Sequence, residues 1–403
     1  MSGLGLASRE LNPMLRRRDG HHAKVTYEEL FFDLVYVFAV TQLSHTLLHH
    51  LTAIGAFQTL VVWFAVWLGW QYTCWVTNWF DPEHPKLRGL LFATMLLALV
   101  MAAAIPQAFG ERGLVFAGCY VAMQLGRTGF ILWQLGRDDP LTPNYRRMGA
   151  WLLVSATFWI GGGLADPETR LALWAVAVLC EYVSPMFGFA FPGFGRSHTR
   201  DWTIEGGHIA ERCQLFVIVA LGETLLATGA TLAEGKVWDG ATLSALAATF
   251  LGTLALWWLY FGTSSKDATT VITRSADPGQ LGAQFHYVHA ILLVGIIVCA
   301  VGNDLAMEHP SGHATVPQVM VIALGPVIYL AGSAIYRRIV YGRMPLSHFV
   351  GIVASLAIAP VGLHVNLLTM GWISTVLLTA TAVWEGLLAK RPVTGSFTSP
   401  SDP

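Results

Sequence analysis

The fold class is decided by residues 89–106, GLLFATMLLALVMAAAIP, a stretch without a charged residue. A helix that crosses the hydrocarbon core of a bilayer needs about 20 predominantly apolar residues. Residues 284–302, QFHYVHAILLVGIIVCAVG, form a second uncharged stretch of this kind. In lipid only helices and closed barrels satisfy every backbone amide, and continuous apolar runs differ from the alternating pattern of a barrel. The sequence therefore predicts an all-α membrane protein.

Apolar windows of similar length recur along the whole chain, and we count twelve of them. The first six are residues 29–48, 57–80, 89–106, 113–135, 147–164 and 171–190. The second six are residues 211–230, 241–262, 284–302, 318–336, 347–366 and 369–389. We therefore predict a polytopic transmembrane helical bundle of about 12 helices. Its expected parts are a cytoplasmic N-terminal segment (1–28), a first six-helix half (29–190), a cytoplasmic linker (191–210), a second six-helix half (211–390) and a disordered tail (391–403).

The composition agrees with a membrane protein and excludes several other classes. The chain has 403 residues, of which 54% are hydrophobic and 12% are charged, whereas about 25% of the residues of a soluble domain are charged. The net charge of −1 argues against a nucleic-acid partner, which requires a basic surface. The five cysteines form no CxxC pair, and no nucleotide-binding or nucleophile motif is present. We therefore expect no cofactor, no metal centre and no catalytic residue.

The distribution of basic residues tests the helix count independently. With the N-terminus on the cytoplasmic side, the inner segments hold 20 of the 24 Lys and Arg residues. The outer segments hold three, and Arg127 lies within a span. Cytoplasmic loops of membrane proteins are enriched in Lys and Arg. We therefore predict an inner-membrane location with both termini in the cytoplasm.

A weak internal repeat appears at an offset of 182 residues. It places the segment that begins at Glu29 on the segment that begins at Glu211, and it places Trp75 on Trp257. Because each half contains an even number of helices, the two halves would be parallel repeats related by an axis along the membrane normal.

Ionisable residues at membrane depth are costly and mark functional sites. At the inner end of the first helix, Glu29 and Asp33 are four residues apart and share one helix face. Arg127, on the fourth helix, is expected to lie deep enough to meet Asp33. Such a pair would either hold helices together or take part in ion or proton passage, and the sequence leaves both open. The other candidates in the inner third are Glu211, Arg212, His286 and His289.

Three further candidates lie near the middle of the membrane, namely Gln42, Glu181 and Glu223. A carboxyl group at this depth that lacks a partner is expected to exchange a proton near neutral pH. Pro185 follows Glu181 by one turn and frees a backbone carbonyl, which suits a binding site. The alternative for each carboxyl is a hydrogen bond to a neighbouring helix.

The two histidines in the inner third of the ninth predicted helix allow two kinds of chemistry. His286 and His289 are three residues apart on one helix, a spacing that permits proton transfer or, more weakly, metal binding.

Several motifs resemble those of the bacterial low temperature requirement protein A (LtrA) family. The first is residues 28–45, EELFFDLVYVFAVTQLSH, the second is residues 208–223, HIAERCQLFVIVALGE, and the third is residues 78–81, NWFD. They span most of the chain. The resemblance implies a multi-pass inner-membrane protein, and it implies no mechanism, because the family is named after a growth phenotype.

A fainter resemblance concerns the endolysosomal potassium and proton channels, whose first helix carries a Phe-Ser-Asp motif. Here Phe31 and Phe32 precede Asp33, and the second half has Leu215 and Phe216 where the aspartate would stand. This departure weakens the prediction of a channel.

Three functions remain open from the sequence. We favour a secondary transporter or permease for a small solute or ion, with possible proton coupling, because the chain has two helical halves, carboxyls at membrane depth and no ATP site. The alternatives are an ion channel and an intramembrane enzyme that acts on a lipid or isoprenoid. The expected partners are the lipid bilayer and the solute, and the oligomeric state stays open.

Overall fold

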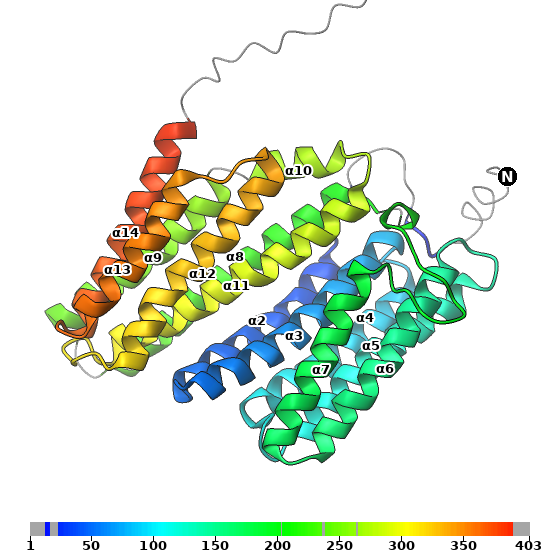
Figure 1. Ribbon diagram of the computed structural model, residues 1–403, viewed down its shortest axis with the longest axis horizontal. Helices are drawn as coiled ribbons and strands as arrows, with labels where there is room; N and C mark the ends of the chain where they lie inside the picture. Colours follow the sequence, from blue (N-terminus) through cyan, green and yellow to red (C-terminus); the bar gives the residue numbers. More distant parts are fainter. Residues whose placement is uncertain (1–12, 17–22, 203, 236–237, 263–264, 390–403) are drawn as a thin grey trace, which may run out of the picture.

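A computed structural model describes residues 13–16, 23–202, 204–235, 238–262 and 265–389. Within these ranges the chain forms thirteen α-helices and no β-strand (Figure 1). In order, the helices are α2 (Tyr27–His49), α3 (Ala53–Trp79), α4 (Pro85–Ala104), α5 (Gly113–Leu135), α6 (Thr142–Leu164), α7 (Pro167–Met186), α8 (Gly206–Glu234), α9 (Gly240–Phe261), α10 (Ser265–Thr273), α11 (Pro278–Glu308), α12 (Val316–Tyr341), α13 (Leu346–Gly362) and α14 (Leu367–Ala389).

Each predicted window falls on one of these helices, and the all-α prediction is confirmed. In the described ranges, nine helices are long and apolar enough to cross a membrane, namely α2, α3, α4, α5, α8, α9, α11, α12 and α14. Helices α6 and α7 begin with polar turns, and α13 is shorter but also apolar. The chain is therefore a multi-pass helical membrane protein.

The helices begin earlier than the apolar windows where polar side chains cap them. Helix α8 begins at Gly206 because the Glu205 side chain accepts hydrogen bonds from the backbone of Gly207 and His208. Helix α11 begins at Pro278 behind the N-cap Asp277. Such caps satisfy the free amides of a first turn. The short helix α10 was not predicted, because it is polar and contains no apolar window.

The helices form two groups with α2 and α3 between them (Figure 1). Helix α2 packs against α3 and α4 and also against α8 and α11, and α3 likewise contacts both α7 and α11. Helices α8 and α11 pack against each other, as do α11 and α12. Helices α2, α3, α8 and α11 therefore form the interface between the N-terminal and C-terminal groups.

Small residues bring α11 and α12 into close contact. A Cβ atom on Gly295 would lie 2.5 Å from the backbone nitrogen of Tyr329, so only glycine fits there. Gly325 approaches the backbone of Cys299 in the same way. Without a hydrophobic drive between helices in lipid, close backbone packing of this kind holds transmembrane helices together.

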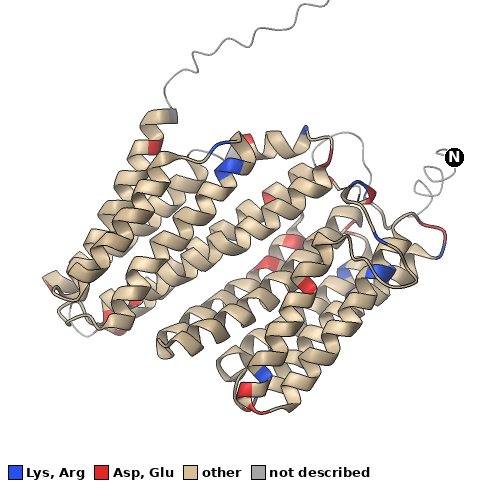
Figure 2. Ribbon diagram, viewed as in Figure 1, with Lys and Arg blue, Asp and Glu red and all other residues tan. Residues whose placement is uncertain are grey.

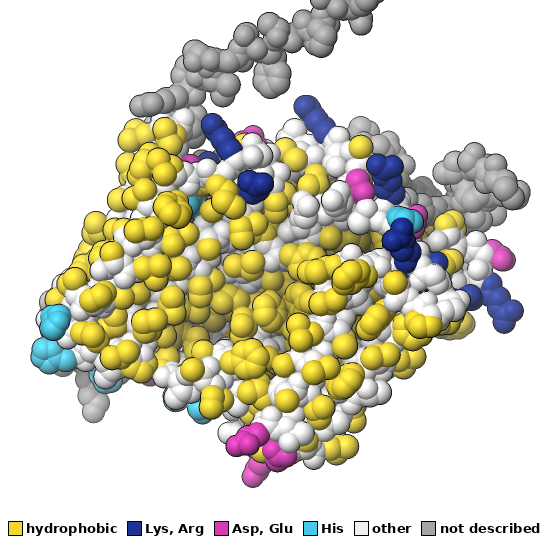
Figure 3. All heavy atoms as spheres, viewed as in Figure 1, with side chains coloured by type: hydrophobic (Ala, Val, Ile, Leu, Met, Phe, Trp, Pro, Cys, Tyr) yellow, Lys and Arg dark blue, Asp and Glu magenta, His cyan; other side chains and the backbone are white. Residues whose placement is uncertain are grey.

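The two ends of the bundle differ in charge. We call the end at which α2 begins the near side, and the end at which α2 terminates, at His49, the far side. Figure 2 shows few charged residues along the helices, and Figure 3 shows basic side chains gathered along the near side. Histidine and acidic side chains lie at the far side in the same view.

The N-terminal segment is partly described. Residues 13–16 run beside the end of α3, where the Arg16 nitrogen donates to the Trp79 carbonyl and the Asp81 nitrogen donates to the Met14 carbonyl. This pairing brings the Arg16 side chain to the near side of the interface. The predicted disordered tail, residues 391–403, lies outside the described residues.

Candidate functional site

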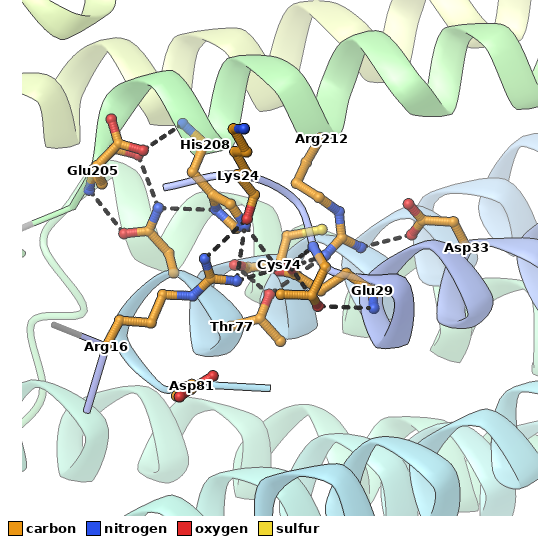
Figure 4. Close-up of polar contacts among 12 residues, drawn as sticks. Arg16, Lys24, Glu29, Asp33, Cys74, Thr77, Asp81, Glu205, His208 and Arg212 are labelled. Carbon is orange, nitrogen blue, oxygen red and sulfur yellow. Dashed lines mark hydrogen bonds and ion pairs between the residues drawn. The ribbon is translucent and has the colours of Figure 1, made fainter. Parts of the chain in front are cut away.

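A cluster of charged side chains lies at the near side of the interface, where α2, α3 and α8 meet (Figure 4). Its two acidic members come from the first turns of α2. Glu29 closes the capping box of this helix with Thr26, and Asp33 follows one turn later on the same face. Both side chains are fully buried. The cap therefore fixes where the first carboxylate stands, and the helix repeat fixes the second.

Glu29 has basic and histidine partners from two other segments. Arg16 Nη2 donates to Oε2 at 2.7 Å, Arg212 Nη1 donates to Oε1 at 2.9 Å, and His208 Nε2 lies 2.8 Å from Oε1. Such charge-assisted bonds are roughly twice as strong as neutral ones. The carboxylate thus ties the N-terminal segment and α8 to α2.

Asp33 is held through one of its two oxygens. Arg212 Nη2 and Trp70 Nε1 each donate to Oδ1 at 2.6 Å. The other oxygen, Oδ2, is buried and has no hydrogen-bond partner among the described residues. A carboxyl with an unpartnered oxygen can accept a proton there without losing a contact.

Arg212 binds both acidic residues and crosses the interface to do so. Its guanidinium lies 5.6 Å from the centre of the Trp70 ring, within cation–π range. It is fully buried, as are its partners. The planar fork of arginine serves two carboxylates in a fixed geometry, which the rotatable ammonium of a lysine does not impose. Arg212 is therefore the central link between the two groups of helices.

His208 is held in one tautomer by its neighbours. Its Nε2 faces the Glu29 carboxylate, and its Nδ1 lies 3.1 Å from Asn78 Nδ2. Because an amide nitrogen only donates and a carboxylate only accepts, Nε2 carries the hydrogen and Nδ1 accepts. The same Asn78 side chain bonds to the backbone of Glu205, which caps α8. His208 is thus neutral in this arrangement.

The charges of the four side chains at the centre of the cluster balance. Two arginines, Arg16 and Arg212, face two carboxylates, Glu29 and Asp33, while His208 is neutral. The attraction between paired buried charges offsets much of their desolvation cost. Removing one partner leaves the other charge buried without this compensation. In the described part of the chain there is no group of three or more His, Cys, Asp or Glu side chains that could hold a metal ion. The cluster is therefore suited to exchanging a proton or to opening as a gate.

A row of tryptophans on α3 continues from this cluster into the membrane. Trp63, Trp67 and Trp70 lie on one face of the helix, and each is buried. The indole nitrogens of Trp63 and Trp67 donate to the carbonyls of Ala290 and His286 on α11. Because these rings fill the space between α3 and α11, they close the interface behind the charged cluster.

Comparison with known proteins identifies the family. Residues 24–383 match the family model described as bacterial low temperature requirement A protein (LtrA). The chain belongs to the LtrA family. It is 38% identical over 383 residues to an uncharacterized protein of Rhizobium meliloti (strain 1021), an alignment that covers 94% of this chain and 92% of the relative. No solved structure matches the chain.

The partner expected for Asp33 in this LtrA protein was wrong. Asp33 pairs with Arg212, whereas Arg127 donates to the Gly69 carbonyl, the Thr73 hydroxyl and the Gln124 amide oxygen. The direction of the Arg127 side chain around the axis of its helix was therefore not predicted. Arg127 therefore belongs to a network within the N-terminal group of helices.

Glu181 belongs to the same network. Tyr120 and Ser155 donate to its two carboxylate oxygens, and Trp159 Nε1 donates to Oε1 at 2.9 Å. Gln124 connects Tyr120 to Arg127. The side chain of Glu181 is buried and has three donors, which matches the alternative expected for it, a carboxyl bonded to neighbouring helices.

Glu223 lies apart from both groups, toward the far side. It is buried on α8, and the side chain of Thr41 on α2 lies next to it. Asp304 on α11 is close enough to interact with it electrostatically. Gln42 is half-buried next to Thr41 in sequence, about 13 Å along α2 from Asp33 by the helical rise. The structure therefore does not bring Glu181 and Glu223 together.

The remaining candidates are spread around the cluster. His286 is buried, and its ring lies 6.0 Å from that of Trp70, while its Nε2 has no partner among the described residues. His289 Nε2 lies 2.6 Å from the Tyr260 hydroxyl. Glu211 is only half-buried, since it points to another side of α8 than its neighbour Arg212.

The sequence did not single out four members of the cluster as site residues: Arg16, Trp70, Asn78 and His208. The signal for two of them was present, because His208 and Asn78 stand in the motifs that resemble those of the LtrA family. Arg16 precedes the first helix and carried no comparable signal. Its position depends on the pairing of residues 13–16 with the end of α3.

Proposed function

We propose that this LtrA protein is a secondary transporter in the inner membrane, with twelve spanning helices in two six-helix halves and both termini in the cytoplasm. Transport would couple to protons, and the near-side cluster would act as both gate and proton site. The observation that carries this proposal is the bond of Arg212 to Glu29 and Asp33, because it joins the two halves through buried charges (Figure 4).

The last helix of each half carries a buried glutamate that bonds to the preceding helix, although these residues are not related by the 182-residue offset. Glu181 on the last helix of the first half accepts a bond from Ser155 on the preceding helix. Glu385 on the last helix of the second half accepts one from Ser347 on its preceding helix. Both glutamates are buried, but Ser155 lies near the middle of α6 whereas Ser347 lies at the start of α13. The two halves would thus share a helical plan and differ in detail.

The orientation follows from charge. Basic side chains gather along the near side (Figure 3), which the rule of positive cytoplasmic loops assigns to the cytoplasm. In this orientation the charged cluster closes the cytoplasmic side of the interface.

Protonation of Asp33 would open this closure. Oδ2 is unpartnered and Oδ1 carries the bond to Arg212. A proton on Oδ2 makes the side chain neutral, and Arg212 then keeps only the Glu29 carboxylate as a counter-ion. The attraction between buried charges is much stronger than that between exposed ones. The two halves would therefore separate on the cytoplasmic side, as alternating access requires.

The test uses purified protein in liposomes that contain a pH-sensitive dye. Panels of amino acids, organic cations, carboxylates and amphiphiles are added outside, and the dye reports solute-driven proton movement. We expect at least one panel to give a signal that Asp33→Asn and Arg212→Gln abolish. The exposed variant Glu168→Gln should keep it.

Planar-bilayer recording separates this proposal from a channel. Carrier turnover produces no resolvable single-channel current, so wild-type membranes should stay silent. Discrete openings that persist in Arg212→Gln would contradict the transporter.

A further inference from the structure

An apolar crevice lies between the two groups of helices on the far side of the tryptophan row. It has a volume of about 700 Å³ and is lined by side chains of α2, α3, α11 and α12, among them Leu47, Leu60, Trp63, Val298, Met320 and Leu324. Figure 3 shows hydrophobic side chains around a hollow between the two groups. All four helices are apolar enough to cross a membrane, so hydrocarbon surrounds the crevice.

The depth of the crevice corresponds to one leaflet. On α12 its lining runs from Val316 to Ile328, which is about 18 Å at the rise of an α-helix. One leaflet contributes about 15 Å to the hydrocarbon core. At its inner end stands Trp63, whose indole is bonded to α11. A straight lipid chain that entered from the far-side surface would therefore end at this tryptophan.

A polar chamber adjoins the crevice at the far-side surface. Its volume is about 260 Å³, and its lining includes Thr46, His50, Gln58 and Gln107. Leu43 and Thr59 line both the chamber and the crevice, so the two spaces lie on either side of these two side chains. Amide, hydroxyl and imidazole groups offer hydrogen bonds to a polar group of modest size.

We infer that the crevice and the chamber together bind an amphiphilic lipid of the far-side leaflet. Its hydrocarbon chain lies in the crevice, and its polar head lies in the chamber. The length of the crevice, its apolar lining and the adjoining polar space each match one part of such a molecule. The occupant is thus a lipid with a chain of leaflet length.

The substrate that this protein transports would then be such a lipid, an inference that rests on the proposed transport function. The crevice opens on the far side while the charged cluster closes the near side, so a lipid bound there occupies the open side of the interface. Binding itself needs no transport, and the experiment below measures binding alone. Its failure would remove the lipid site and leave the proton-coupled transporter standing.

The experiment is native mass spectrometry of the full chain, purified from vesicles of phosphatidylethanolamine and phosphatidylglycerol with 16-carbon chains. We expect wild-type protein to retain one lipid after mild delipidation. Ala56→Trp and Leu324→Trp each place a bulky ring in the crevice, and each should lower the retained fraction at least about tenfold, equivalent to about 1.4 kcal/mol of binding. Leu96→Trp on the exposed face of α4 is the matched control and should retain lipid as wild type does.

A second arm tests the polar head. A 16-carbon alkane with no head group should compete poorly for the site, and the double variant Gln58→Ala, Gln107→Ala should bind the phospholipids less tightly while circular dichroism shows an intact fold. Equal retention in the crevice variants and in Leu96→Trp would overturn the inference. So would competition by the alkane as strong as that by the lipid, because the chamber would then have no role.

Discussion

Arg212 and Asp33 are 179 residues apart in sequence and are joined by a 2.6 Å hydrogen bond that crosses the interface between the two groups of helices. The same guanidinium bonds to Glu29. A lone arginine or a lone carboxylate would be costly at this depth, so each residue depends on the other. Four predictions follow from this cluster and from the residues around it.

Replacing Arg212 by glutamine should destabilise the protein strongly. Removal of one member of a buried ion pair costs about 3–5 kcal/mol, because its partners are left uncompensated. Arg212→Lys should recover only part of this loss, since a point charge cannot serve two carboxylates in the same geometry. Thermal unfolding in detergent measures the effect, and Arg338→Gln on an exposed position is the control. Equal melting temperatures for Arg212→Gln and Arg338→Gln would contradict the role of Arg212 in joining the two groups of helices.

Replacing a tryptophan of α3 should lower the free energy of unfolding by an amount that depends on the acceptor of its indole hydrogen bond. Trp70→Phe removes a hydrogen bond to a buried carboxylate, worth about 1.5–3 kcal/mol, whereas Trp67→Phe removes one to a carbonyl, worth about 1 kcal/mol. Trp258→Phe, on a half-exposed ring, should have little effect. Chemical unfolding measures the stability of the three variants. A loss of unfolding free energy in Trp67→Phe as large as that in Trp70→Phe would contradict the prediction.

Glu181→Gln should affect stability without affecting proton coupling. Its carboxylate accepts bonds from Tyr120, Ser155 and Trp159, and an amide cannot accept all three. A buried donor without a partner costs about 1–3 kcal/mol. In liposomes the solute-driven dye signal should keep its pH dependence. Loss of the dye signal in Glu181→Gln, as expected for Asp33→Asn, would place the proton site at Glu181 instead.

The sequence predicted the helices well because the signal for each one is local. A run such as residues 89–106 contains its own evidence, and the matching helix α4 spans Pro85–Ala104. The boundaries were less accurate where a polar cap extends the helix, as Glu205 does for α8. Helix α10 lies in a polar segment and gave no signal of this kind.

The site was predicted in part, because depth can be read from sequence and direction cannot. Glu29, Asp33 and Arg212 were all expected at the inner end of the bundle, and they meet there. Arg127 was expected to join them, but it faces Gly69 and Thr73. Which side of a helix a residue faces depends on the packing of its neighbours, and that is a property of the whole fold.

Two native cysteines give the most direct test of the central claim, that loss of the Asp33 charge opens the near side of the interface. Cys213 follows Arg212, Cys74 lies one turn beyond Trp70, and both are buried. N-ethylmaleimide is applied to protein in nanodiscs at pH 7, and mass spectrometry follows the labelling of each cysteine. Asp33→Asn mimics the protonated side chain, and it should speed labelling of both cysteines at least about tenfold over wild type and over Glu168→Gln, since a gain of about 1.4 kcal/mol in opening suffices. Equal labelling rates in all three proteins would contradict the claim.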